Sequence, residues 1–365
     1  MIRVCFVMEQ QIGHQTFYRN LRRFASAEPE IDARWVEVTY WQENGRWERL
    51  PLVPGGIKGP LRGLWQVRRG LENGPFDVAV FNTQVPAVLS LGHFRRAPAV
   101  VITDITPIQY DSMGRAYGHR ADRRGPLKGL KYRASRRVFQ GAAWVVPWSH
   151  WVRQSLLADY GVPEARIQVI PPGVDLTRWR PAGGQARPEG GRVRLLFVGG
   201  DFWRKGGDLL LEVFRQMDRE RVELHLVTRE AVPHEPGIRV YHHMKPNSPE
   251  LIGLYQQSHV FVLPSRAEAF GIAAVEAQAA GLPAVVARSG GIADVVTHSQ
   301  TGFIVPPDDA NALAQSLRAL VENPSLRAEM GLRARQAAEN RFDAQKNVAR
   351  LLALVKQAAV ETHGK

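Results

Sequence analysis

The sequence is short of cysteine and of long apolar runs, and each shortage excludes a class of protein. Cys5 is the single cysteine among 365 residues, so no disulfide framework can form within the chain, and we interpret it as a small buried thiol in a strand. No apolar run approaches the roughly 18 residues of a membrane-spanning helix. The first run, over residues 2–8, is followed by a polar Glu-Gln-Gln segment. We therefore expect neither a signal peptide nor a membrane span, and we expect the protein to work in the cytoplasm.

Basic residues are in excess, and they are concentrated in the first half. The formal net charge is +13; residues 1–150 carry 22 Lys and Arg against 12 Asp and Glu, whereas the remainder carries 26 against 23. Residues 115–137 are the densest part and contain one acid, Asp122. Their nine cations are Arg115, Arg120, Arg123, Arg124, Lys128, Lys131, Arg133, Arg136 and Arg137. Such a segment can be a solvated face, a nucleic-acid footprint, or a patch that meets anionic lipid or a phosphorylated acceptor.

The composition, with 44% hydrophobic and 23% charged residues, is that of a globular protein, and the length suffices for two domains. Short apolar runs of strand type alternate with segments of helical period. We expect strands over residues 2–8, 34–39, 77–81, 99–103, 143–147, 166–170, 194–198, 222–227, 260–263 and 284–287. We expect helices over residues 13–27, 61–71, 126–139, 150–160, 205–217, 249–257, 270–280, 308–321, 323–340 and 345–359. This alternation predicts βαβ units and mostly parallel sheets.

A stretch rich in proline and glycine divides the chain. Residues 171–173 and 181–191 have no periodicity and are typical of a hinge. We therefore predict two doubly wound, Rossmann-like α/β domains. The predicted division is a first domain over 1–175, a linker over 176–192, a second domain over 193–342, and a C-terminal helix over 343–365 that can pack back on the first domain.

Two loops of the second domain have the composition of a phosphate site. In a parallel α/β domain, ligands lie beyond the carboxyl ends of the strands, where glycines allow close approach and helix N-termini attract anions. The first loop follows the strand at 194–198 and contains Gly199, Gly200, Arg204 and Lys205. Two adjacent cations can hold a diphosphate without a metal. An ordinary loop with solvated cations has the same composition, so this loop alone does not decide.

The second loop follows the strand at 260–263. It carries Glu268, reaches Gly271 at the mouth of a helix, and is followed by Glu276 inside that helix. The main-chain N–H groups of residues 270–272 would form an anion site with the helix dipole. Glu268 could accept hydrogen bonds from sugar hydroxyls, and Glu276 could hold both hydroxyls of a ribose. By spacing alone, two such glutamates are more often surface charges; the order of strand, loop and helix favours a nucleotide site.

The residues around these glutamates resemble a known family. Glu268 and Glu276, within EAFGIAAVEAQAAGLPAVVARSGGIADVV, look like the E-x7-E signature of the retaining glycosyltransferases of family 4, which have the GT-B fold. The segments VIPPGVD (169–175), VGGDFWRKGGDLLL (198–211), VFVLPSRAEAFG (260–271) and TGFIVPPDDANALAQSL (301–317) agree with it. The resemblance covers nearly all of the second domain and, more weakly, the first. It implies two Rossmann-like domains that face each other across a cleft.

The resemblance implies a role for each matching residue. Glu268 would orient the donor sugar and Glu276 would bind the ribose. Arg204 and Lys205 would bind the diphosphate and stabilise the leaving group. The implied donor-binding set is Gly13, Gly199, Gly200, Arg204, Lys205, Thr228, Met244, Glu268, Ala269, Phe270, Gly271, Ile272 and Glu276, with Thr228 and Met244 near the base. Neither a metal ion nor a cofactor is expected, since no convincing Asp-x-Asp motif is present and the nucleotide sugar is a substrate.

The first domain departs from the family pattern. Many relatives have a His-Asp pair after a strand, and that His helps to bind the sugar. The corresponding positions here are Thr103 and Asp104, and a threonine cannot protonate. Asp104 remains a candidate catalytic residue. His14 and His119 are candidates for the role of the missing His, although a lone His is more often structural.

The implied activity is metal-independent, retaining transfer of a hexose from a UDP- or GDP-linked sugar to a saccharide, lipid or other hydroxyl acceptor in cell-envelope or polysaccharide biosynthesis. The donor phosphate itself would help to deprotonate the acceptor, while the protein positions the reactants. The acceptor would bind chiefly to the first domain. The alternatives are a nucleotide-sugar epimerase of the same architecture and a non-catalytic nucleotide-sugar-binding protein.

The basic segment over 115–137 suggests a further partner. Together with Trp65, Tyr117 and Tyr132, it could meet an anionic acceptor or the inner face of the plasma membrane, where the protein would be peripheral. A solvated surface is the other interpretation. Nucleic acid is not an expected partner, because no recognised nucleic-acid-binding motif accompanies the isoelectric point of 10.3.

Overall fold

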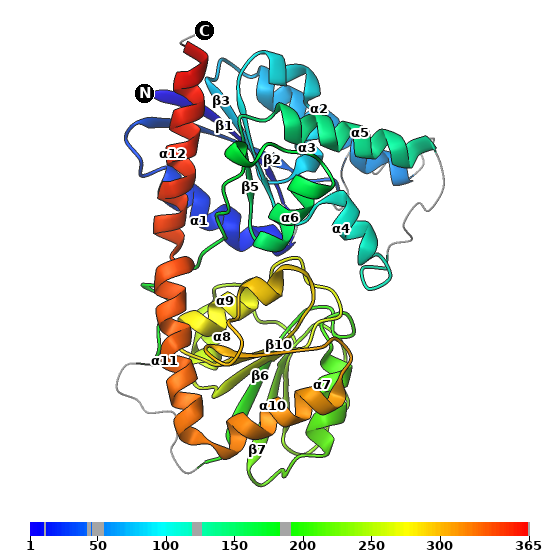
Figure 1. Ribbon diagram of the computed structural model, residues 1–365, viewed down its shortest axis with the longest axis vertical. Coiled ribbons are helices and arrows are strands. Elements are labelled where there is room, and N and C mark those ends of the chain that lie inside the picture. The colour runs from blue at the N-terminus through cyan, green and yellow to red at the C-terminus, as the bar shows by residue number, and fades with distance from the viewer. Residues whose placement is uncertain (11, 42–44, 46–54, 119–125, 183–190, 364–365) are drawn as a thin grey trace. The chain divides into compact units, whose positions relative to one another are not determined.

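Two compact α/β units make up the described chain. The computed structural model describes residues 1–10, 12–41, 45, 55–118, 126–182 and 191–363. The first unit comprises the described residues within Met1–Ser112, Arg120–Pro171 and Gln345–Lys365, and the second those within Met113–His119 and Pro172–Ala344. Figure 1 shows one sheet with packed helices in each unit. The boundaries expected from the sequence stay a prediction, and residues 183–190 of the expected linker lie outside the described residues.

The sheet of the first unit is parallel throughout. Its strands, in the order β2-β1-β3-β4-β5, are β1 (Ile2–Glu9), β2 (Ile31–Val38), β3 (Val78–Phe81), β4 (Ala99–Thr103) and β5 (Trp144–Pro147). Every side chain of β3 and β4 is buried. A parallel sheet covered on both faces needs apolar residues at successive positions, and this is why these segments appear as continuous apolar runs.

The helices of the first unit lie between its strands and at the C-terminus. They are α1 (Gln15–Ala25), α2 (Gly55–Glu72), α3 (Gln84–Val88), α4 (Pro107–Ser112), α5 (Pro126–Gly141), α6 (His150–Ala158) and α12 (Ala344–His363). Ser149 caps α6, because its hydroxyl accepts a hydrogen bond from the Val152 N–H at 3.2 Å. Lys356 of α12 forms ion pairs with Glu28, at 3.1 Å, and with Glu30. These pairs tie α12 to the strand-connecting turn before β2.

The sheet of the second unit is also parallel. Its strands, in the order β11-β10-β9-β6-β7-β8, are β6 (Val193–Val198), β7 (Val222–Val227), β8 (Ile238–Tyr241), β9 (Val260–Leu263), β10 (Ala284–Ala287) and β11 (Gly302–Val305). Its helices are α7 (Gly207–Arg215), α8 (Pro249–Gln256), α9 (Ile272–Ala279), α10 (Ala310–Glu322) and α11 (Pro324–Arg341). Ser248, Asp309 and Asn323 cap α8, α10 and α11 through their side chains. The predicted α/β class with two doubly wound parallel sheets is confirmed.

One predicted strand is wrong and two strands were not predicted. Of residues 166–170, Arg166 ends a short 3-10 helix, and the rest form only an isolated bridge, between Ile167 and Val145. Pro171 and Pro172 come next and have no N–H to donate, so this pairing cannot extend into a ladder. The strands β8 and β11 escaped prediction because each has only four residues, and both lie at edges of the sheet. Among the described helices, none combines the length and apolar content that crossing a membrane requires.

Candidate active site

Each sheet reverses its strand order beside its first strand. In the second unit the chain runs from β6 to β7 and β8 on one side, and from β9 to β10 and β11 on the other, so the switch point lies between β6 and β9. Ligands of such sheets bind beyond the carboxyl ends of the strands at this point. The loops over residues 199–206 and 264–271 follow β6 and β9. The two loops predicted to bind phosphate are therefore neighbours at the switch point.

Glycines allow the first loop to lie against the second. Gly206 has φ of +75°, and a Cβ at this position would lie 2.1 Å from the carbonyl oxygen of Pro264. Only glycine fits both demands. Gly199 is buried, and its Cβ would lie 2.9 Å from the Phe197 ring, whereas Gly200 is exposed. The main chain of the loop after β6 is thus fixed by contact with the loop after β9.

The two predicted phosphate-binding cations lie between these loops. Lys205 forms an ion pair with Glu268, and their side chains are only 15% and 9% exposed. The Arg204 guanidinium donates to Asp201 at 2.9 Å and to the carbonyl oxygen of Ala267 at 2.9 Å. It also lies over the ring of Tyr117, at 4.7 Å from the centroid. The structure therefore brings Arg204, Lys205 and Glu268 together, as the sequence predicted for a donor site.

Arg266 is a residue of this site that the sequence did not reveal. Its guanidinium donates to both carboxylate oxygens of Asp208, at 2.7 and 3.0 Å, and to Asp308 at 2.7 Å. It stacks on the Trp203 ring at 4.6 Å and donates to the Trp203 carbonyl at 2.5 Å, while its main-chain N–H donates to the Arg204 carbonyl at 2.9 Å. Arg266 thus holds the loop that carries the two cations. Its carboxylate partners lie 58 and 42 positions away in sequence, so no local pattern announces them.

The helix α9 begins where the anion site was predicted. Gly271 is its N-cap residue with φ of +93°, and a Cβ there would lie 2.8 Å from the Ile292 side chain. Ile272 opens the helix, two residues later than predicted, so its N–H has no intrahelical acceptor and the N–H groups of residues 270 and 271 belong to the loop. Ala269 and Ile272 are half-buried, and Phe270 is buried with its ring 6.3 Å from that of Phe342.

Glu276 is buried one turn inside α9. Its side chain accepts a hydrogen bond from the Tyr255 hydroxyl at 3.1 Å, and only 5% of the residue is exposed. Burial raises the pKa of Glu276 to about 8, although the hydrogen bond from Tyr255 opposes the rise. Glu268 is likewise buried, with 7% exposed. Neither glutamate is therefore the solvated surface charge that their spacing alone would favour.

The two residues predicted near the base follow neighbouring strands. Thr228 comes directly after β7 and is buried, and its hydroxyl accepts a hydrogen bond from the Glu230 N–H at 3.3 Å. Met244 is half-buried and follows β8, the next strand of the sheet. Their predicted roles stay predictions. No group of three His, Cys, Asp or Glu side chains that could hold a metal ion occurs among the residues that the structure describes.

A pair of a buried histidine and a half-buried aspartate lies at the carboxyl edge of the first sheet. His14 follows β1 and Asp104 follows β4, and their side chains approach to 3.3 Å between Nε2 and Oδ2. The His14 ring packs on Trp148 at 5.1 Å. Burial lowers the pKa of His14, but the neighbouring charges of Asp104 and Glu9 and the hydrogen bond to Asp104 outweigh it, so that the pKa is raised above its ordinary value. The geometry therefore joins His14 to the predicted Asp104.

The other first-unit candidates are placed differently. Thr103 is buried, and its hydroxyl lies 2.9 Å from acceptors on Gln84 and Ile105, so it is engaged within the protein. Gly13 is exposed and nothing lies within 4 Å of where its Cβ would be, so packing does not demand a glycine there. His119 lies outside the described residues.

The basic segment over 115–137 is described only in part. Residues 119–125 and the side chains of residues 126–128 lie outside the description. The Tyr132 hydroxyl donates to the Asp159 carbonyl at 2.7 Å, and Tyr117 contacts Arg204, so both aromatic rings have partners within the protein. Trp65, on α2, is 47% exposed.

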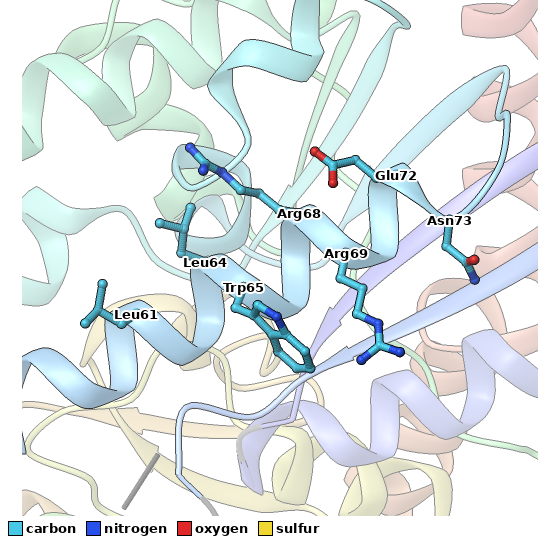
Figure 2. Close-up of a pocket in the computed structure, with 7 residues that line it drawn as sticks. All are labelled: Leu61, Leu64, Trp65, Arg68, Arg69, Glu72 and Asn73. Atoms are coloured by element: carbon cyan, nitrogen blue, oxygen red, sulfur yellow. The ribbon is translucent and has the colours of Figure 1, made fainter. Parts of the chain in front are cut away.

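One face of α2 presents Trp65 among cations. Leu61, Leu64, Trp65, Arg68, Arg69, Glu72 and Asn73 line a hollow of about 660 Å³. Figure 2 shows these side chains projecting from successive turns of α2, with Asn73 directly after the end of the helix. The Arg69 guanidinium lies over the Trp65 ring, at 5.1 Å from its centroid. The exposed face of α2 thus combines an aromatic ring, an exposed leucine and two cations.

Comparisons with known proteins agree with this geometry. The family model "Glycosyltransferase Family 4" matches residues 22–178, and the model "Glycosyl transferases group 1" matches residues 184–337. A D-inositol 3-phosphate glycosyltransferase of Pseudarthrobacter chlorophenolicus is 28% identical over 310 residues, which are 79% of this chain and 72% of that protein. Relatives of the same name from Arthrobacter sp. and Kineococcus radiotolerans are 30% and 31% identical. Each of these alignments spans about half of this chain and about half of the relative.

Solved structures share the fold along nearly the whole chain. Sucrose-phosphate synthase from Thermosynechococcus elongatus superposes with a TM-score of 0.75 at 17% identity, covering 98% of this chain and 99% of that one. Anabaena Alr3699/HepE in complex with UDP superposes with a TM-score of 0.70 at 17% identity, covering 98% of this chain and 100% of that one. The two family models together match most of the residues of both units. The chain belongs to the family 4 glycosyltransferases and has the GT-B fold that the sequence predicted.

Proposed function

We propose that this glycosyltransferase moves a hexose from a uridine diphosphate sugar to an acceptor hydroxyl, with retention of configuration and without a metal ion. The observation that carries the proposal is the meeting of two loops at the switch point of the second sheet, where Arg204 and Lys205 lie beside Glu268 and the start of α9. Cations, a helix N-terminus and carboxylate acceptors are the groups that recognise a nucleoside diphosphate sugar.

Donor binding would rearrange the pair at Lys205. A diphosphate competes with Glu268 for the same ammonium group, so Lys205 would turn to the phosphate and Glu268 would be released to accept hydrogen bonds from the sugar. As the glycosidic bond breaks, negative charge grows on the departing diphosphate. Arg204 is held in place by Asp201 and Ala267. Together with Lys205, already turned to the phosphate when the donor binds, it would stabilise that charge as the bond breaks.

The acceptor would attack from the face that the diphosphate leaves. A phosphate oxygen of the donor would take the proton from the acceptor hydroxyl, so the protein needs only to hold the two substrates together. Asp104 is the first-unit carboxylate proposed to hold an acceptor hydroxyl, and its contact with His14 fixes its orientation. Supplying positive charge from Arg204 and Lys205 is what would make a metal ion unnecessary.

The nature of donor and acceptor is supported by the relatives. Anabaena HepE was solved with UDP and with UDP-glucose, and several curated relatives are named D-inositol 3-phosphate glycosyltransferases. We therefore favour a uridine nucleotide and an acceptor that is a saccharide, polyol or lipid-linked hydroxyl compound of the cell envelope or of a polysaccharide. The excess of cations in residues 1–150 fits an acceptor that carries negative charge.

A transfer assay tests the activity. The protein is incubated in EDTA with UDP-glucose, UDP-galactose or GDP-mannose and a panel of phosphorylated and neutral acceptors, and NMR of the product gives the anomeric configuration. We expect transfer with retention in EDTA. Transfer that requires added Mg²⁺ would refute metal independence. Isomerised donor without transfer would indicate an epimerase, and donor binding without any turnover would indicate a non-catalytic binding protein.

A membrane contact through α2 is the proposed second interaction. Trp65 and Leu61 are exposed beside Arg68 and Arg69, and this pairing of apolar side chains with cations suits an anionic lipid surface. The contact would keep the enzyme peripheral to the inner face of the plasma membrane, in the cytoplasm, where a lipid-linked or charged acceptor would be encountered.

A further inference from the structure

Tyr255 is a buried residue that contacts the predicted ribose-binding carboxylate from a different helix. Its hydroxyl lies 3.1 Å from Oε2 of Glu276 and 3.2 Å from the carbonyl oxygen of Ala273. Tyr255 belongs to α8, whereas Glu276 and Ala273 belong to α9. One hydroxyl therefore links the two helices at the position of the carboxylate.

The Tyr255 hydroxyl donates its hydrogen bond to Glu276. Burial, and after it the neighbouring Glu276, raise the pKa of Tyr255 well above its ordinary value, so the phenol keeps its proton. The two oxygens within reach of this proton are Oε2 of Glu276 and the carbonyl oxygen of Ala273, so the hydroxyl donates to one of them. The hydrogen bond occupies Oε2 and limits the rotation of the carboxylate about its last bond.

Packing on several sides holds the ring of Tyr255 in one position. It is fully buried, stacked on Phe261 at 5.8 Å and set edge-on to Trp179 at 5.2 Å. Trp179 is itself held, because its indole N–H donates to the side chain of Asn247 at 2.9 Å. A fixed ring gives a fixed hydroxyl, and a fixed hydroxyl sets the orientation of the carboxylate that it binds.

We infer that Tyr255 is a positioning residue for nucleotide recognition: it orients the Glu276 carboxylate so that both ribose hydroxyls can bind to it. The inference rests on the proposed function, in which Glu276 binds the ribose of the donor. A misoriented carboxyl group could still reach one hydroxyl, but binding both hydroxyls of a ribose needs both of its oxygens directed toward the diol. Tyr255 would contribute to donor affinity without touching the donor.

The test compares two nucleotides in two matched variants. Tyr255→Phe removes the hydroxyl and keeps the ring, and Tyr160→Phe removes a buried hydroxyl of the first unit, which accepts a hydrogen bond from the Ile108 N–H. Calorimetry measures the affinity of each for UDP and for 2′,3′-dideoxy-UDP. We expect Tyr255→Phe to weaken UDP binding about fivefold to tenfold, the usual worth of one hydrogen bond, and to leave 2′,3′-dideoxy-UDP unchanged. Tyr160→Phe should change neither.

Other outcomes separate this inference from the proposed function. Equal weakening of both nucleotides by Tyr255→Phe would mean that the hydroxyl acts by shaping the start of α9 through Ala273, and would overturn the inference. Unchanged UDP affinity would overturn it too. In the Glu276→Ala background, Tyr255→Phe should add no further loss, since the two residues act through one interaction. If the unaltered protein binds UDP and GDP equally poorly, the proposed function itself fails.

Discussion

Lys205 is the residue whose ammonium group would exchange one partner for another, the Glu268 carboxylate for a phosphate of the donor. Its ammonium group is paired with Glu268 in a setting where both side chains are nearly buried. A buried ion pair gives little net stability, because desolvation offsets the attraction, so its presence at the mouth of α9 is better explained by exchange with an incoming phosphate. Replacing either member leaves the other as an unpaired buried charge.

We predict that Lys205→Ala lowers kcat about a hundredfold or more, since one preorganised charge on a developing anion contributes this much. Glu268→Ala should lower kcat as well. The control is Arg333→Ala, which removes a cation from an exposed ion pair with Glu329 on α11 and should leave kcat unchanged. The assay is donor turnover at saturating acceptor, with the melting temperature measured alongside. A normal kcat in Lys205→Ala would refute its role at the leaving group.

Because of Glu276, we predict that the free energy of unfolding changes with pH in the direction opposite to that given by an ordinary carboxylate. Its pKa is raised from 4.5 to about 8 in the folded protein, so between these values the folded state keeps a proton that the unfolded chain has lost. Stability therefore falls as the pH rises through this window, by about 1.4 kcal/mol for each unit of pKa difference. A glutamine at this position does not titrate, so it would not lose stability as the pH rises.

We therefore expect the melting temperature of Glu276→Gln, relative to that of the unaltered protein, to rise by several degrees between about pH 5 and about pH 8. Thermal unfolding at the two pH values measures it. Two melting curves that keep the same separation at both pH values would show that the carboxyl titrates normally.

At the scale of elements, the loop after β6 owes its position to Gly206. We predict that Gly206→Ala lowers the melting temperature and weakens donor binding, because alanine disfavours φ of +75° and its Cβ would meet the Pro264 carbonyl at 2.1 Å. The expected cost is about 1–3 kcal/mol. The control is Gly253→Ala within α8, where nothing lies within 4 Å. It should raise stability by about 0.5–1 kcal/mol. Equal effects of the two variants would contradict the strain argument.

Vesicle flotation tests the membrane contact proposed for helix α2. The protein should float with vesicles that contain anionic lipid and not with neutral vesicles, and the double variant Trp65→Ala, Arg68→Ala should lose most of this binding. The control is Leu332→Ala, which removes an exposed apolar side chain from α11 of the second unit. Failure of the unaltered protein to float with either vesicle would remove the membrane proposal.

The sequence predicted the elements well wherever local chemistry determines them. Buried parallel strands such as β3 and β9 are unbroken apolar runs, and caps such as Asn323 before Pro324 mark helix starts. Residues 166–170 misled the prediction, since apolar character alone cannot show that two prolines end the pairing. Contacts set by tertiary packing were also invisible. Arg266 and Tyr255 contact partners on other loops and helices, and the spacing of residues in the sequence does not predict these contacts.

Within the candidate site, the residues that follow strands could be predicted and their partners could not. Glu268 and Lys205 were expected in one site because both loops leave the carboxyl ends of strands, but their direct ion pair depends on the glycine contacts between the loops. His14 and Asp104 were separate candidates in the sequence. The strand order β1-β3-β4 brings them to one edge, and only the structure joins them.

At the scale of the whole molecule, the two units share a plan and differ in charge. Each is a parallel sheet whose order reverses beside its first strand, and each places candidate polar groups at that edge. The net positive charge belongs mainly to residues 1–150. This arrangement supports a donor site in the second unit and the binding of a charged acceptor by the basic first unit.

The most direct test is a crystal structure of the protein with UDP. We predict that the diphosphate contacts Arg204, Lys205 and the main-chain N–H groups of residues 271–272, and that the ribose hydroxyls lie against Glu276, with Lys205 turned away from Glu268. UDP bound elsewhere, with the ion pair of Lys205 and Glu268 intact and the start of α9 bare of phosphate, would contradict the account.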